Sequence, residues 1–152
     1  MNQSAGILLY RFNNHLLEVF LVHPGGPFWK GKDKGVWTIP KGEFETEEPL
    51  EAAKREFQEE TGVLLNGNFI ELKPVKQKSG KCVFAWAVEG DLDIKAIVSN
   101  SFKMEWPYKS GKWKSFPEVD KGEWFTIEAA VEKINAAQIS FLLELQEKLQ
   151  QG

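Results

Sequence analysis

The chain has 152 residues, 42% of them hydrophobic and 27% charged, which is typical of one soluble globular domain covering residues 1–152. A formal net charge of −3 and a pI near 5.5 argue against a general nucleic-acid-binding role, and no apolar run approaches the ~18 residues of a membrane span. The single cysteine, Cys82, excludes an internal disulfide, and the chain shows no secretion signal, so we expect a cytoplasmic location.

The first part of the chain predicts a β-hairpin followed by a long loop. Residues 5–11 and 16–22 are apolar runs with β-branched and aromatic residues, and Asn13-Asn14 between them favours a turn. The prolines and glycines of residues 23–27 then interrupt regular structure. Residues 36–39 predict a short strand that ends before a proline.

A helix is predicted over residues 49–61. Pro49 suits a first helical turn, the residues after it are mostly good helix formers, and Gly62 stands where a helix should end. Three apolar residues share one face of this helix and are expected to pack on a core: Leu50, Ala53 and Phe57.

The second half of the chain predicts three further strands and two helices. The strands are expected at residues 69–76, 81–88 and 100–106, and the helices at 127–134 and 137–149. The stretch 107–122 between them is the longest irregular segment, and loops of that length are often functional. Strands interrupted by one helix and closed by a helical pair indicate a layered α/β domain.

Acidic residues are concentrated between residues 42 and 60. Eight glutamates and two basic residues give this span a charge of −6, so the rest of the chain sums to +3. On the predicted helix, Glu56, Glu59 and Glu60 stand at i, i+3 and i+4 and project from one face. Like charges at this spacing repel, and Mg²⁺ is a natural counter-ion because it prefers carboxylate oxygens. A solvated acidic face is the ordinary alternative.

The order of these residues resembles the Nudix box. The match consists of Glu47, seven intervening residues, and then Arg-Glu-Phe-x-Glu-Glu-x-Gly-Val at 55–63. The family pattern has five residues between its leading glycine and its first glutamate, whereas four separate Gly42 from Glu47 here. We interpret the difference as a one-residue deletion in the loop, which leaves open whether Glu47 or Glu48 fills the first glutamate position.

The resemblance implies a Nudix-type α/β/α sandwich, with a mixed sheet between helices, and a pyrophosphohydrolase that uses Mg²⁺ or Mn²⁺. Its metal ligands would be Glu56, Glu59, Glu60, the carbonyl of Gly42, and Glu47. One of these glutamates, Glu59 or Glu56, would also assist deprotonation of the attacking water. Arg55 would hold a carboxylate in place, unless it merely forms a surface pair with the glutamate at position 51.

The implied substrate is a nucleoside diphosphate linked to another group, with a dinucleoside polyphosphate resembling diadenosine tetraphosphate as the first hypothesis. That choice rests on a weaker likeness of residues 4–22 and the Gly-Gly-Pro-Phe-Trp loop to a bacterial Nudix branch near the dinucleoside polyphosphate hydrolases. ADP-ribose, an oxidised nucleoside triphosphate and an inositol polyphosphate are alternatives, as is a nucleotide-binding module that has lost catalysis. The high aromatic content is compatible with a homodimer.

The candidate substrate contacts are Trp29 and Trp106, which could stack on a base, and Lys41 and Lys112, which could meet phosphates. Tyr108 and Trp113 are further candidates for stacking. A single lysine is more often simply solvated, and at least half of the tryptophans are expected in the core. A distal general base is sought among three glutamates: Glu105, Glu118 and Glu123.

Overall fold

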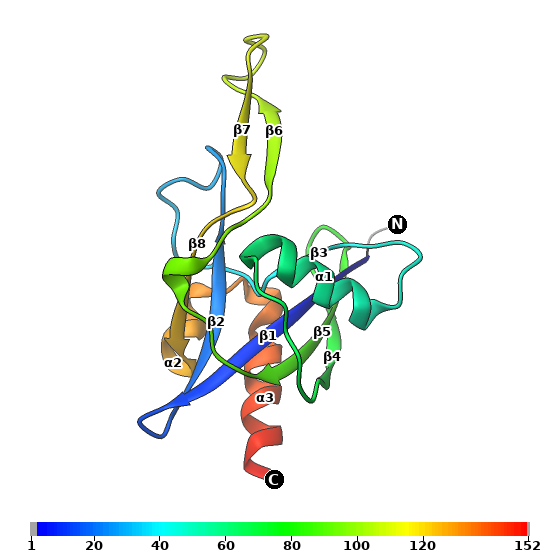
Figure 1. The fold of residues 1–152 in the computed structure, drawn as a ribbon, viewed down its shortest axis with the longest axis vertical. Coiled ribbons are helices and arrows are strands. Elements are labelled where there is room, and N and C mark those ends of the chain that lie inside the picture. Colours follow the sequence, from blue (N-terminus) through cyan, green and yellow to red (C-terminus); the bar gives the residue numbers. More distant parts are fainter. Residues whose placement is uncertain (1–2, 152) are drawn as a thin grey trace.

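The computed structural model describes residues 3–151, which form a mixed β-sheet with helices on both of its faces (Figure 1). The strands are β1 (Gln3–Asn13), β2 (Leu16–Pro24), β3 (Lys41–Glu43), β4 (Ile70–Lys76), β5 (Cys82–Glu89), β6 (Ser101–Glu105), β7 (Trp113–Pro117) and β8 (Val119–Thr126). The helices are α1 (Pro49–Thr61), α2 (Ile127–Lys133) and α3 (Ile139–Gln151), with 3-10 turns at Ile94–Ala96 and Ala136–Gln138. The predicted α/β/α architecture is confirmed. Within residues 3–151, no helix is both long and apolar enough to cross a bilayer.

Strand β1 is the centre of the main sheet. The strand order is β4-β5-β1-β2-β8, in which β1 and β5 run parallel and the other neighbours run antiparallel. β3 pairs with the first residues of β1, where Gly42 lies opposite Ala5. The predicted β1–β2 hairpin is confirmed. Its turn lies one residue later than expected, at Asn14 and His15, whose positive φ angles of 51° and 68° suit a two-residue hairpin turn.

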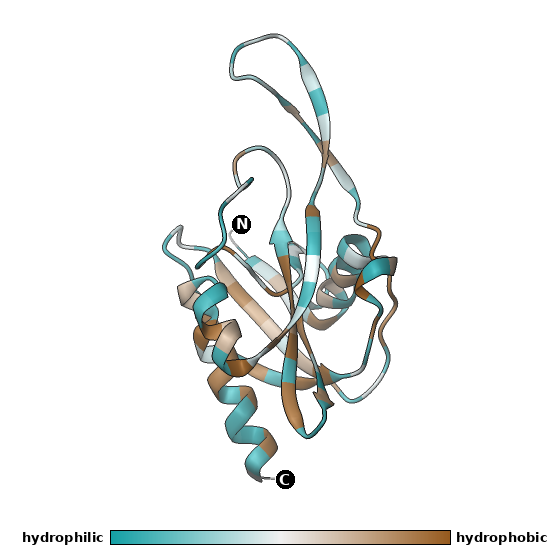
Figure 2. Cartoon of the chain, turned by 90° about the vertical axis from the view of Figure 1, so that its left-hand side faces the viewer, coloured by the Kyte–Doolittle hydropathy of each residue, from teal (hydrophilic) through white to brown (hydrophobic). Residues whose placement is uncertain are grey.

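Alternate residues of β1 enter two hydrophobic cores, one on each face of the sheet. Ile7 and Leu9 pack in the core beneath α1, whereas Leu8 and Tyr10 pack in the core beneath α3. Burial on both faces explains why the sequence of β1 is a continuous apolar run rather than an alternating one. Figure 2 shows the same arrangement, with hydrophobic colour over the central strands and hydrophilic colour on the outer side of the helices.

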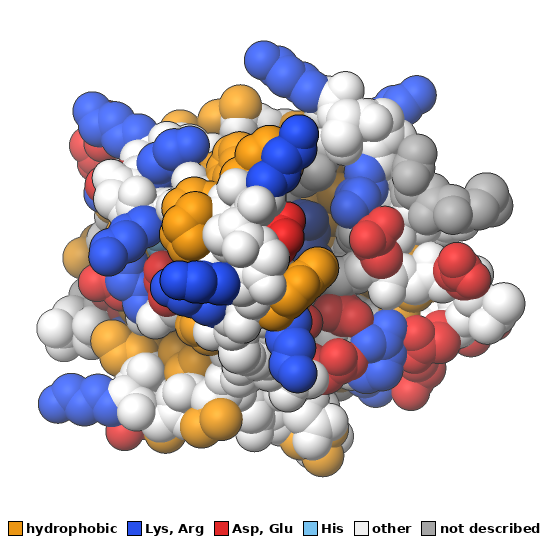
Figure 3. Space-filling model, turned by 90° about the horizontal axis from the view of Figure 1, so that it is seen from above, with side chains coloured by type: hydrophobic (Ala, Val, Ile, Leu, Met, Phe, Trp, Pro, Cys, Tyr) orange, Lys and Arg blue, Asp and Glu red, His pale blue; other side chains and the backbone are white. Residues whose placement is uncertain are grey.

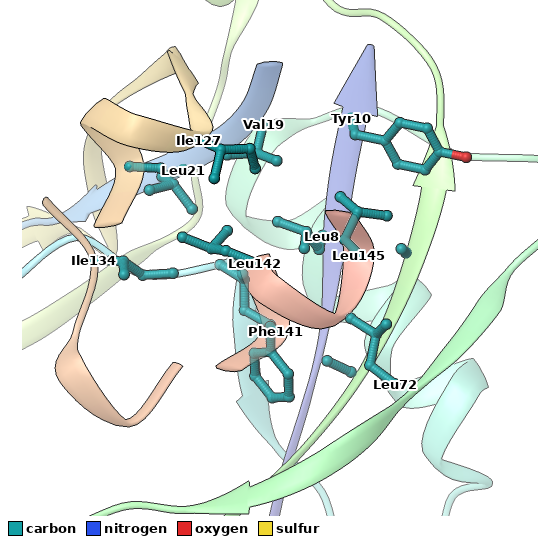
Figure 4. Packing of buried hydrophobic residues seen from close by; sticks show 14 of the residues in the cluster. Leu8, Tyr10, Val19, Leu21, Leu72, Ile127, Ile134, Phe141, Leu142 and Leu145 are labelled. Carbon is teal, nitrogen blue, oxygen red and sulfur yellow. The ribbon is translucent and has the colours of Figure 1, made fainter. Parts of the chain in front are cut away.

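Helix α3 covers one face of the sheet through an apolar stripe. Phe141, Leu142 and Leu145 are fully buried and meet Leu8 of β1 in the same core (Figure 4). Both predicted C-terminal helices are confirmed. The second begins at Ile139, two residues later than predicted, because a 3-10 turn precedes it.

Helix α1 covers the opposite face over the predicted range. Ala53 and Phe57 are fully buried and Leu50 is partly buried in the core on that side. Burial of a side chain such as Phe57 contributes about 1.5–3 kcal/mol. Gly62 ends the helix in the left-handed region, at φ 81°, and its N–H donates to the carbonyl of Gln58 at 2.7 Å.

Strands β6 and β7 form a separate hairpin that projects from the top of the molecule in Figure 1, beside the long loop after β2. Their register runs from Ser101 opposite Pro117 to Glu105 opposite Trp113. The prediction of an irregular stretch at 107–122 is therefore wrong for most of its length. The sequence of β7 is Trp-Lys-Ser-Phe-Pro, in which polar and aromatic residues do not alternate and most residues are exposed, so it gives only a weak strand signal.

The prediction of a strand at residues 36–39 is also wrong. Two isolated bridges replace it, between Thr38 and Val22 and between Trp37 and Ile134. The chain becomes a true strand only at β3, after Pro40, which has no N–H to contribute to a ladder.

Candidate active site

Three carboxylates converge where the last turns of α1 meet the start of β8. Single oxygens of Glu56, Glu60 and Glu118 lie within 4.8 Å of one another. Glu56 and Glu60 are buried, with only 8% and 6% of their surfaces exposed, and Glu118 is less buried. Glu56 and Glu60 come from the predicted helical face, whereas Glu59, the third glutamate predicted there, is not among the converging residues. The third converging residue, Glu118, is one of the three distal glutamates considered from the sequence.

Glu118 reaches α1 because the chain before β6 docks on the end of that helix. The N–H of Val98 donates to the carbonyl of Thr61 at 2.9 Å, and the N–H of Asn100 donates to the carbonyl of Glu59 at 2.8 Å. The N–H of Glu118 then donates to the carbonyl of Asn100 at 2.8 Å. These bonds satisfy carbonyls that the helix end leaves free and hold residue 118 beside the helix.

The other two distal glutamates lie elsewhere. Both carboxylate oxygens of Glu105 accept hydrogen bonds inside the β6–β7 turn, from the N–H groups of Lys109 and Gly111 at 3.2 and 3.0 Å. Glu123 lies in the middle of β8, opposite Leu21 of β2. Neither residue is among those that converge with the helical glutamates.

Arg55 links the acidic loop to the carboxylates of α1. Its Nε and Nη2 donate to Glu47 at 2.9 and 2.7 Å, and its Nη1 donates to Glu56 at 2.6 Å and to Glu59 at 2.5 Å. The hydrogen bonds with Glu47 are the main cause of a raised pKa for the guanidinium, and they lower the pKa of the Glu47 carboxyl. The surface pair with Glu51 does not form, because Glu51 lies next to Lys54 instead, at 3.5 Å.

The two loop glutamates therefore have different places. Glu47 is the partner of Arg55, at 2.7 Å. Glu48 is the residue before α1, and its carbonyl accepts the N–H of Ala52 at 3.0 Å. The geometry thus favours Glu47 in the first position, at the side of the cluster.

Burial dominates the electrostatics of the cluster. Removal from water raises the pKa of Glu60 to about 9, and the nearby charges of Glu56 and Glu118 act in the same direction. Burial also raises the pKa of Glu56, against the effect of the Arg55 hydrogen bond, and raises the pKa of Glu118. The pKa of Lys41, on the neighbouring strand, is lowered by burial and by Lys81. A buried carboxyl such as that of Glu60, whose pKa lies above neutral pH, is suited to a cationic ligand that would displace its proton.

Gly42 lies directly against this cluster. A Cβ atom at this position would be 1.9 Å from Oε1 and 2.1 Å from Cδ of Glu56, so any side chain would collide with the carboxylate. Steric exclusion of a side chain therefore explains why the leading residue of the box is a glycine. The backbone of Gly42 lies close enough to the cluster to take part in the same site.

Replacement of Gly42 by alanine is expected to lower activity about 10- to 100-fold, the cost typical of displacing a group that orients a metal ligand. The obstacle is the end of the flexible side chain of Glu56, so the carboxylate should turn aside while the fold survives. Thermal melting would show whether the fold is intact, and calorimetric Mg²⁺ titration would show weaker binding. Unchanged Mg²⁺ affinity and activity would contradict this account of Gly42.

The four residues predicted to contact substrate lie in different places. Lys41 belongs to β3 and acts electrostatically on Glu60. Trp106 lines a cavity beneath the β6–β7 hairpin. Trp29 lies in the loop after β2 with the ammonium of Lys32 5.5 Å from its ring centre, and Lys112 lies in the hairpin turn. Only Lys41 is therefore adjacent to the carboxylates, and Trp29 and Lys112 lie outside the lining of the cavity.

Comparison with known proteins identifies the family of the chain. The NUDIX domain model matches residues 2–145, so the chain belongs to the Nudix family. No curated protein matches the chain.

Several solved structures share the fold at low sequence identity. An Ap4A hydrolase from C. elegans, in a binary complex, is 21% identical with a TM-score of 0.70, over 98% of this chain and 99% of that chain. The NUDIX domain of Shewanella oneidensis NrtR, complexed with ADP ribose, is 15% identical with a TM-score of 0.67, over 97% and 87% of the two chains. A MutT structure from work on Aliivibrio salmonicida and Vibrio cholerae is 13% identical with a TM-score of 0.54, over 93% and 92%.

Proposed function

We propose that the chain hydrolyses a phosphoanhydride bond in a nucleoside diphosphate linked to another group, with a dinucleoside polyphosphate such as diadenosine tetraphosphate as its substrate. The observation that carries this proposal is the convergence of Glu56, Glu60 and Glu118 within 4.8 Å, two of them buried. Three acids packed this closely repel one another once ionised, and a bound divalent cation would offset that repulsion.

The donor set fits a hard divalent ion. The converging side chains offer carboxylate oxygens only, which suit Mg²⁺ or Mn²⁺ rather than a softer metal. Glu56, Glu60 and Glu118 would hold the ion, together with the carbonyl of Gly42. When bound, such an ion polarises phosphoryl oxygens and lowers the pKa of a water molecule.

The remaining residues of the box have separate tasks. Arg55 holds the carboxylates of Glu56 and Glu59 in place, because its Nη1 donates a hydrogen bond to each of them. The Glu59 side chain is about one-third exposed, at 32%, so it can accept the proton of an attacking water. Lys41, next to the cluster on β3, would face the phosphate oxygens that the ion does not cover.

The choice of substrate rests on relatives as well as on the sequence. The similar C. elegans structure is an Ap4A hydrolase, and its match extends over nearly the whole of both chains. The likeness to the NrtR domain complexed with ADP ribose favours ADP-ribose as the second candidate, and the likeness to MutT keeps an oxidised nucleoside triphosphate as a third. A module without activity is disfavoured, because all the box glutamates and Arg55 are present and Arg55 contacts three of them.

A substrate panel tests the proposal. Purified protein is incubated with diadenosine tetraphosphate, ADP-ribose, an oxidised nucleoside triphosphate or an inositol polyphosphate, with Mg²⁺, with Mn²⁺, or with EDTA. We expect metal-dependent hydrolysis, fastest for diadenosine tetraphosphate, with one water consumed to give either AMP and ATP or two ADP. Product identification by mass spectrometry shows which bond breaks. Absence of hydrolysis for every compound with either metal would refute an enzymatic role.

A further inference from the structure

A cavity of about 570 Å³ lies between the β6–β7 hairpin and the loop that follows β2. Its volume is within the range of roughly 300–1,000 Å³ that small-molecule sites occupy. Trp106, Lys114 and Phe116 line it from the hairpin, and Gly26 and Lys30 line it from the loop. The cavity is thus bounded by two aromatic rings and two cationic side chains that come from segments distant in sequence.

The two walls are packed together through a pair of glycines. The N–H of Gly25 donates to the carbonyl of Glu118 at 2.9 Å, and a Cβ at Gly25 would lie only 2.0 Å from the carbonyl oxygen of Pro117. Gly26 has a φ of +96°, and a Cβ there would lie 3.0 Å from the ring of Phe102. The loop can approach the hairpin this closely only because both residues lack a side chain, so the cavity exists before any ligand enters.

A buried histidine orients an acceptor at the rim of the cavity. Asp120 also lines the cavity, and its Oδ1 lies 2.9 Å from Nδ1 of His23. The other ring nitrogen of His23 lies 2.6 Å from the carbonyl oxygen of Lys32, so both sides of the imidazole are held. Within residues 3–151, the side-chain hydrogen bonds of Asp120 involve Oδ1, which leaves Oδ2 to accept from a hydroxyl or amine of a ligand.

The cavity and the carboxylate cluster share a backbone segment. Pro117 lines the cavity, and the next residue, Glu118, belongs to the cluster. Seen from above in Figure 3, basic and hydrophobic side chains are interspersed over the top of the molecule, and acidic side chains gather to one side of them.

Resting on the proposed function, we infer that this cavity binds the nucleoside part of the substrate. Trp106 and Phe116 stack on the base, Asp120 accepts from an amine or ribose hydroxyl, and Lys30 and Lys114 face the phosphate oxygens. Stacking tolerates every base, so the site selects a nucleoside 5′-diphosphate derivative with little preference among bases. An inositol polyphosphate has no aromatic face and would not use the cavity.

The test compares a ligand that has a base with one that has none. Binding of ADP and of inorganic pyrophosphate is measured by calorimetry with Mg²⁺, for the wild type and for Trp106→Ala. We expect Trp106→Ala to weaken ADP binding about 10- to 100-fold, as loss of a base–aromatic stack does. Pyrophosphate binding should not change, and with diadenosine tetraphosphate the KM should rise while kcat stays within a few-fold.

A matched control lies on the same hairpin. Trp113 is 68% exposed and does not line the cavity, so Trp113→Ala should bind both ligands as the wild type does. Phe116→Leu keeps the apolar volume but removes an aromatic face, and it should also weaken the binding of ADP without weakening the binding of pyrophosphate. This second variant tests the site independently if Trp106→Ala melts at a lower temperature.

The outcomes separate this inference from the proposed function. Selective loss of ADP binding in Trp106→Ala and Phe116→Leu supports the cavity even if no compound of the panel is hydrolysed. Hydrolysis by a wild type whose Trp106→Ala and Phe116→Leu variants retain ADP affinity would overturn the cavity assignment and leave the catalytic proposal standing. Equal weakening by Trp113→Ala, or equal loss of pyrophosphate binding, would also overturn it.

Discussion

Replacement of Glu60 by glutamine is expected to lower kcat for the best substrate by about 100-fold or more. Loss of a group that merely supports a metal ligand costs 10- to 100-fold, and a ligand itself should cost at least as much. Glutamine keeps the shape of the side chain but cannot ionise, so it cannot supply the negative charge that a divalent ion requires. Mg²⁺ titration by calorimetry should show weaker binding in parallel with the loss of activity.

The same substitution should leave the metal-free fold intact. Burial raises the pKa of Glu60 to about 9, so its carboxyl is neutral at neutral pH without a cation, and a neutral amide replaces it closely. Glu51→Gln is the matched control, because Glu51 lies on the same helix with a side chain that is 65% exposed. Full activity in Glu60→Gln, or an equal loss in Glu51→Gln, would show that the buried cluster is not the catalytic site.

The helical half of this site was predictable because its determinants are local. Pro49 and Gly62 bound α1 as the sequence indicates, and the spacing of Glu56 and Glu60 places both on one face of the helix. Membership in the Nudix family, expected from the box, is confirmed by the family match. A contiguous motif of this kind specifies its own geometry once the helix forms.

The third carboxylate was not predictable from local pattern. Glu118 is distant from α1 in the sequence, and it reaches the cluster through hydrogen bonds that involve Val98 and Asn100. Nothing in the residues around Glu105, Glu118 and Glu123 distinguishes them, since the choice depends on which backbone segment docks on the helix end.

The cavity was missed for a related reason. Its two walls come from the loop after β2 and from β7, a strand whose sequence was interpreted as irregular. Trp106 was identified as a candidate for stacking, but Trp29 was not distinguishable from it until the hairpin placed only Trp106 at the cavity. The sequence of Gly25-Gly26 indicates only a loop, whereas its tight contact with the hairpin also requires the absence of side chains.

Without metal, the free energy of unfolding is expected to fall as pH rises from 5 to 8. Glu60 keeps its proton to about pH 9 in the folded protein but loses it near pH ~4.3 when unfolded. The folded state therefore binds more protons between these pH values, and stability declines with pH across that window. The slope approaches about 1.4 kcal/mol per pH unit for one such group, so we expect a total loss of about 2–4 kcal/mol over three units.

Other shifted groups act outside this window or in the same direction. The pKa values of Glu56 and Glu118 are also raised by burial, so they add to the decline. The pKa of Glu47 is lowered by its hydrogen bonds with Arg55, and its contribution to stability is lost only in acid, below the window. Burial lowers the pKa of Lys41, so loss of its proton at alkaline pH makes the free energy of unfolding rise with pH, opposite to the effect of the glutamates. For this reason pH 8 is the upper limit of the measurement.

Urea unfolding at several pH values in EDTA, for the wild type and Glu60→Gln, isolates the contribution of Glu60. The wild type should lose stability with pH, and the variant should show a shallower slope because its amide does not titrate. Added Mg²⁺ should restore the free energy of unfolding of the wild type at pH 8 but not that of the variant, because an ion that binds only the folded state stabilises that state. Identical slopes in the two proteins would mean that Glu60 does not hold its proton in the folded state. In that case the cluster would carry no electrostatic cost for a cation to relieve, and the physical case for a metal at this position would be lost.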